Sequence, residues 1–82
     1  MATLTIYYDG RKQVEYDPLL TGIIGRTPNS SGMFLGNPPE RDLQWYQVPE
    51  KEAIRFSKKI KKMFPDVTIE ISKQEKGYGT QK

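Results

Sequence analysis

The chain has 82 residues, of which 35% are hydrophobic and 28% are charged, with a net charge of +3. This length fits one small domain with a modest core. Because the sequence contains no cysteine and no histidine, it excludes disulfides, thiolate or imidazole metal ligands, and catalysis by a histidine base. The N-terminus lacks a signal-peptide pattern, and no apolar run approaches the roughly 20 residues of a membrane span. We therefore expect a soluble, cytoplasmic protein that does not bind membranes.

The first two elements have the pattern of a β-hairpin. Apolar and polar residues alternate in TLTIYY and again in KQVEYD, which is the period of a half-buried strand. A three-residue loop at 8–10 pairs Leu4 with Val14 and places Gly10 in the left-handed conformation of a G1 bulge. We predict this hairpin, with Pro18 ending its second strand.

The middle of the chain is rich in glycine and proline. Residues 19–25 have the composition of a possible third strand, which a central glycine weakens. Residues 25–42 hold turn-forming residues and a stiff Asn-Pro-Pro connector, so we predict a long loop there. Residues 43–48 return to strand composition, with Leu43 and Trp45 on one face.

One amphipathic helix is predicted at about 49–64. Pro49 suits the first turn of a helix, and Pro65 ends it. Apolar residues recur on one side, where they predict a core-facing stripe: Ala53, Phe56, Ile60, Met63 and Phe64. A strand with one solvated face follows at 67–72, and the polar segment 74–82 is predicted to be a flexible tail.

Together these elements predict a single α+β domain over residues 1–73. One helix would pack on one face of a mostly antiparallel sheet of four or five strands. The pattern does not determine the order of the strands.

The predicted helix concentrates positive charge. Residues 51–62 hold six basic side chains and one acid, Glu52, so the remaining chain has a net negative charge. Like charges stand four residues apart at Arg55–Lys59 and at Lys58–Lys62, and such pairs destabilise a helix. The basic side chains that share one arc are Lys51, Arg55, Lys58, Lys59 and Lys62. This arc is either the solvated face of an ordinary helix or a surface for an acidic partner.

The first functional hypothesis is a non-enzymatic domain whose basic helix face binds nucleic acid. Phosphate neutralisation would dominate the affinity and make it depend on salt. Tyr7 and Tyr46 oppose the core-facing residues of their strands, so they are candidates for stacking on bases. We expect no catalytic residues, no cofactor and no metal site.

The alternative hypothesis is a small protein-binding adaptor, inhibitor or complex subunit. It would use the loop at 25–42, where Met33, Phe34 and Leu35 form an apolar group, together with the basic helix against an acidic protein surface. The same three side chains could instead tuck under the loop as an extension of the core. A third possibility is a homodimer formed through an exposed edge of the sheet.

Overall fold

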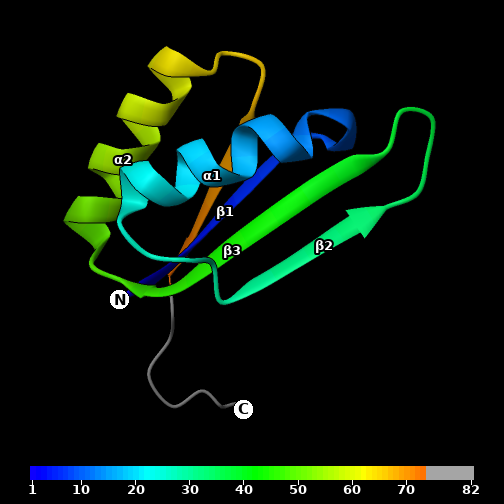
Figure 1. Cartoon of the computed structure of the whole chain (residues 1–82). Coiled ribbons are helices and arrows are strands. Elements are labelled where there is room, and N and C mark those ends of the chain that lie inside the picture. Colours follow the sequence, from blue (N-terminus) through cyan, green and yellow to red (C-terminus); the bar gives the residue numbers. More distant parts are fainter. Residues whose placement is uncertain (74–82) are drawn as a thin grey trace, which may run out of the picture.

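The computed structural model describes residues 1–73, and the tail predicted at 74–82 lies outside the described residues. The elements in chain order are β1 (Ala2–Asp9), a 3-10 turn η1 (Gly10–Lys12), α1 (Gln13–Ile24), β2 (Ser30–Phe34), β3 (Glu40–Val48), α2 (Glu50–Met63) and β4 (Thr68–Lys73). The strands form one antiparallel sheet in the order β2-β3-β1-β4. Both helices cover the same face of this sheet (Figure 1). This is the ferredoxin-like, split β-α-β arrangement, which serves many unrelated functions.

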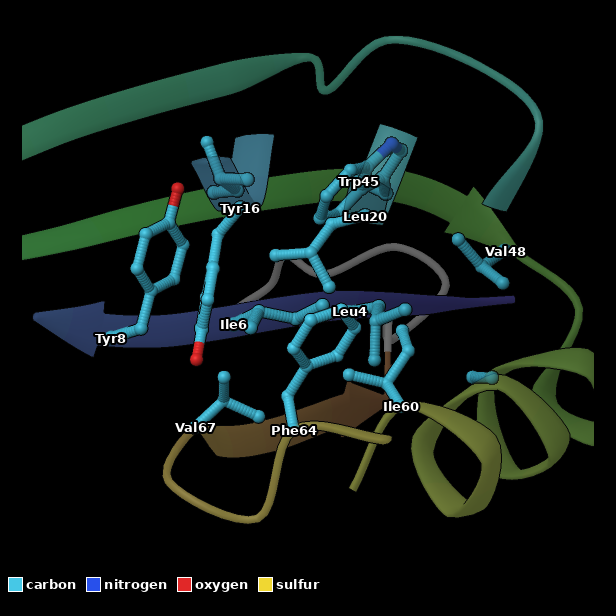
Figure 2. Close-up of a cluster of buried hydrophobic side chains, with 12 residues drawn as sticks. Leu4, Ile6, Tyr8, Tyr16, Leu20, Trp45, Val48, Ile60, Phe64 and Val67 are labelled. Atoms are coloured by element: carbon cyan, nitrogen blue, oxygen red, sulfur yellow. The ribbon is translucent and has the colours of Figure 1, made fainter. Parts of the chain in front are cut away.

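The core lies between the helices and the sheet face that they cover (Figure 2). The central strands β1 and β3 supply four of its fully buried large side chains, Leu4, Ile6, Leu43 and Trp45, and α1 and α2 supply Leu20 and Ile60. A bulge in β3 places Gln47 at φ 55° and shifts the register between the pairs Ala2–Val48 and Leu4–Trp45. Because of this extra residue, Trp45 and Val48 both point into the core.

The predicted N-terminal hairpin is wrong. The segment expected to form its second strand belongs to η1 and α1. Of the residues 19–25 expected to form a third strand, 19–24 continue α1 and Gly25 caps it. Leu4 pairs with Trp45 on β3 and Ile71 on β4, while Val14, its expected partner, is 89% exposed. Pro18 lies inside α1 rather than at a strand end.

The caps of these helical segments explain the error. The Asp9 carboxylate accepts a hydrogen bond from the Arg11 amide and so begins η1, whereas the adjacent glycine had suggested a hairpin turn. Gly25 closes α1 in the left-handed conformation at φ 92°, with its amide 2.8 Å from the Thr21 carbonyl oxygen. The apolar residues of α1 are spread around the helix and do not form one stripe, and few of its residues are buried. The repeat of apolar residues that would predict a helix is therefore weak in this segment.

Three other corrections concern the sheet and its cover. Two helices, not one, pack on a sheet of four strands. The predicted loop at 25–42 contains β2 and the beginning of β3. Met63, predicted to be in the core, is exposed at the last residue of α2.

The elements in the second half of the chain are otherwise as predicted. The helix expected at about 49–64 is α2. The strand expected at 43–48 lies inside β3, and the strand expected at 67–72 corresponds to β4 with both ends shifted by one residue. Within residues 1–73, no helix has both the length and the apolar composition that crossing a membrane requires.

Candidate nucleic-acid interface

The candidate interface is the outward side of α2. The helix is anchored by Ala53 and Ile60, which are fully buried, and by Phe64 just after its end. Acidic residues in the first turn and basic residues in the last turn suit the helix dipole. All five predicted site residues are exposed to solvent: Lys51, Arg55, Lys58, Lys59 and Lys62. We call these five side chains the basic face.

The basic face is not neutralised by the rest of the described chain. Within residues 1–73, no carboxylate oxygen lies within 4.0 Å of a charged nitrogen of these five side chains. Glu52, the acid nearest in sequence, makes no such pair with Arg55. The Arg55 guanidinium lies 6.0 Å from the centre of the Phe56 ring, a contact that leaves its charge in place.

Basic residues elsewhere in the described chain behave differently. Four of them pair with carboxylates: Arg11 with Asp9 at 2.6 Å, Lys12 with Asp66 at 3.0 Å, Arg41 with Asp17 at 2.8 Å and Lys73 with Glu50 at 4.0 Å. Arg26 donates to the backbone carbonyl of Tyr46. Among residues 1–73, every carboxylate that forms an ion pair therefore does so with a basic group outside the basic face.

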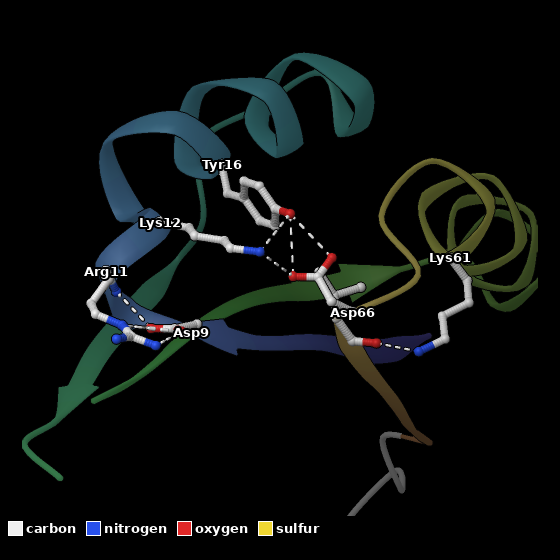
Figure 3. A network of polar contacts seen from close by, with 7 residues as sticks. Asp9, Arg11, Lys12, Tyr16, Lys61 and Asp66 are labelled. Carbon is white, nitrogen blue, oxygen red and sulfur yellow. Dashed lines mark hydrogen bonds and ion pairs between the residues drawn. The ribbon is translucent and has the colours of Figure 1, made fainter. Parts of the chain in front are cut away.

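Asp66 organises the polar network beside α2 (Figure 3). Its carboxylate accepts hydrogen bonds from the Lys12 ammonium and from the Tyr16 hydroxyl, 3.0 and 3.1 Å away. The hydrogen bond from Lys12 holds the pKa of Asp66 below its usual value, and the same contact raises the pKa of Lys12. Lys61 donates to the carbonyl of Val67, so it turns back to its own chain and is not part of the basic face.

The face of the sheet that carries no helix has the opposite charge. Alternation along the strands and their register bring four carboxylates to this face: Asp9, Glu40, Asp42 and Glu70. An open hollow of about 420 Å³ lies at one end of it, lined in part by Asp9, Glu40 and Asp66. This acidic face was not predicted from the sequence, although the acids Glu40 and Asp42, two residues apart in β3, indicate it.

Tyr7 lies within this acidic region. Its hydroxyl donates to Glu70 Oε1 at 3.2 Å. Partial burial, this hydrogen bond and the nearby carboxylates raise the pKa of the Tyr7 hydroxyl. Tyr46, the other proposed base-stacking residue, has its hydroxyl 3.2 Å from Gln44 Oε1. The structure does not bring these rings to the basic face, because the sheet separates them from α2.

The apolar group predicted in the loop is split between two environments. Met33 lies in β2 and is half-buried beside Gly10. Its side chain occupies the space that a Cβ atom on residue 10 would need. Phe34 and Leu35 are 70% and 86% exposed. Phe34 and Leu35 therefore do not form the extension of the core that was one reading of this segment.

Within the part of the chain that the structure describes, no three acidic, histidine or cysteine side chains are grouped to hold a metal ion. Comparisons with protein-family models, with curated proteins and with solved structures find no match to this chain. The charge distribution and the exposed groups of the molecule are thus the basis for any functional inference.

Proposed function

We propose that this protein binds the backbone of nucleic acid through the basic face of α2. The observation that carries the proposal is the lack of any carboxylate partner for the five cations among residues 1–73, while four other cations in this region are paired. Cations that are held close together at the cost of mutual repulsion favour a polyanionic ligand.

The dimensions of the basic face suit a short stretch of backbone. Lys51 and Lys62 are eleven residues apart, which corresponds to about 16 Å along a helix axis. A nucleic-acid strand advances about 3.4 Å per nucleotide in the B form, so this length spans about five phosphates. The acidic face on the other side of the sheet would repel the same ligand, so binding would have a single orientation.

The first test compares two double variants that remove the same charge. Lys58→Gln/Lys62→Gln removes two cations of the basic face, whereas Arg11→Gln/Lys73→Gln removes two exposed cations that are paired elsewhere. Exposed pairs contribute little to stability, so both variants should fold, which circular dichroism can verify. Fluorescence anisotropy with labelled single-stranded and duplex oligonucleotides then measures the affinity over a salt series.

We expect the wild type to bind with a log–log salt slope of about −3.5 to −4.5 if five phosphates are contacted. The K58Q/K62Q variant should bind more weakly, and its slope should be shallower by about 1.4 to 1.8. The R11Q/K73Q variant should keep the wild-type slope. Equal losses in both variants would mean that overall charge, not the basic face, drives binding, and would contradict the proposal.

A second candidate function is binding to an acidic protein through α2 and the β2–β3 hairpin. The specific observation in its favour is the exposure of Phe34 and Leu35, since apolar groups at a loop commonly mark a contact surface. Phe34→Ala/Leu35→Ala should then abolish capture of a protein partner, with modest dependence on salt. Unchanged capture by this variant would exclude the hairpin from the interface.

A further inference from the structure

We propose that two copies of this chain associate through the edge strand β2. The two β2 strands would pair antiparallel about a two-fold axis and join the two sheets into one continuous sheet. This inference concerns a surface away from the basic face and does not rest on the nucleic-acid proposal.

The first observation is that β2 is an edge without the usual protection. β3 pairs with one side of β2, and within residues 1–73 no strand pairs with the other side. Natural edge strands are commonly blocked by charged side chains, prolines or bulges. Ser30–Phe34 has none of these, and the whole segment 27–39 contains no charged residue in a chain that is 28% charged.

The second observation is that exposed apolar side chains flank this edge. Phe34 and Leu35 stand at the end of β2, where they are 70% and 86% exposed. α1 is the helix nearer to β2, because its residue Asp17 pairs with Arg41 on β3, the strand beside β2. α2 covers the same face but contacts β1 and β4, toward the opposite edge of the sheet. A partner at the β2 edge would therefore meet Phe34 and Leu35 beside the strand and would lie away from α2 and its basic face.

The charge distribution indicates that this partner is a second copy. A two-fold interface places each surface against itself, so any charge in it faces its own like charge. The uncharged segment 27–39 meets its copy without that repulsion. The β4 edge would meet its own copy with repulsion, because β4 carries the charged residues Glu70 and Lys73. It also lies beside α2, so pairing two β4 strands would bring two basic faces together.

The symmetry restricts the register. A two-fold axis perpendicular to the sheet keeps the helices of both copies on the same face of the joined sheet. Residues that are opposite each other across the two strands must then point to the same face. This condition holds only where the axis passes through a residue that is paired with its own copy. An axis at Gly32 uses all of Ser30–Phe34 and places the two copies of Ser31 on a diagonal, about 7–8 Å apart.

The first test is the mass in solution of the full chain without nucleic acid. Sedimentation velocity and light scattering over a dilution series should give the wild type twice its 9.5 kDa chain mass. Ser31→Lys should give the monomer mass, because lysine on the edge places like charges at the interface. Ser72→Lys makes the same change on the exposed β4 edge and should leave the dimer intact. Thermal unfolding of both variants verifies that they are folded.

A second measurement locates the contact. The chain has no cysteine, so Ser31→Cys and Ser72→Cys each introduce a single thiol. A short bis-maleimide should join two Ser31→Cys chains efficiently and should leave Ser72→Cys chains unlinked.

The proposal would be overturned by a wild type that stays monomeric, which would leave the β2 edge to a different protein. It would also be overturned by a dimer that Ser72→Lys dissociates and Ser31→Lys does not. Cross-linking of Ser72→Cys chains without cross-linking of Ser31→Cys chains would contradict it as well. None of these readouts involves nucleic acid, so a failure here is distinct from a failure of the function proposed for the basic face.

Discussion

Arg41 on β3 and Asp17 on α1 form an ion pair inside the fold, with Nη2 and Oδ2 2.8 Å apart. Their side chains are only 14% and 25% exposed. Arg41 Nε and Asp17 Oδ1 are buried and make no hydrogen bond within the described residues. The pair thus attaches α1 to the sheet but satisfies its own polar groups incompletely.

This geometry predicts opposite outcomes for breaking and for replacing the pair. Asp17→Ala or Arg41→Ala should lower the free energy of unfolding by about 2–3 kcal/mol, since each leaves a largely buried charge alone. Asp17→Leu/Arg41→Met should return it to within about 1 kcal/mol of the wild type. Urea unfolding followed by Trp45 fluorescence measures both. The exposed pair of Arg11 and Asp9 provides a control, because Arg11→Ala should change the urea midpoint much less than either change to the buried pair.

Acid stability should depend on Asp9 and Asp66. Hydrogen bonds from Arg11 lower the pKa of Asp9 to about 2, and Lys12 lowers that of Asp66, whereas an unfolded aspartate titrates near about 3.9. The folded state therefore binds fewer protons, so this stabilisation is complete above about pH 4 and is lost as the pH falls toward about 2.

Thermal midpoints measured from pH 5 to pH 2 should fall less steeply in Asp9→Asn and Asp66→Asn than in the wild type. Asp42→Asn is the matched control, because Asp42 forms no ion pair within residues 1–73. If all three variants keep the wild-type pH dependence, other groups must account for the loss in acid.

Two glycines of the α1 region should respond oppositely to alanine. Gly25 has φ 92°, a conformation that costs an L-residue about 1–2 kcal/mol, so Gly25→Ala should destabilise the fold by that amount. Gly22 lies within α1, and apart from its chain neighbours and the backbone of its own helix no atom lies within 4 Å of where its Cβ would be. Gly22→Ala should therefore stabilise by about 0.5–1 kcal/mol. Equal effects of the two changes on the urea midpoint would be inconsistent with α1 ending at Gly25.

Arg55→Glu should separate stability from binding. It converts the like-charge pair with Lys59 into a favourable glutamate–lysine pair four residues apart, which should raise the free energy of unfolding by about 0.5–1 kcal/mol. The same variant should bind oligonucleotides more weakly, with the loss growing at low salt. A variant that is more stable and binds as well as the wild type would indicate that Arg55 is only a solvated surface residue.

Patterns within single segments predicted several elements correctly. α2 follows from one apolar stripe between two prolines, and the positions of Leu43 and Trp45 follow from alternation along β3. These signals are local, because the side chains that share a face are set by the period of the element itself. α1 lacked such a signal, since Asp9-Gly10 is compatible with both a turn and a helix start, and its apolar residues do not share one face.

By itself, the sequence determined that cations collect on one side of α2, because residues three and four apart in a helix must share a face. The tertiary structure decided whether those cations would stay unpaired within the described chain. The fold brings Asp66 to Lys12 and Asp17 to Arg41, partners that are distant in sequence, and the remaining acids gather largely on the opposite face of the sheet. It also decided that β2 is an edge, since strand order depends on how the two helices pack the strands together and not on any one segment.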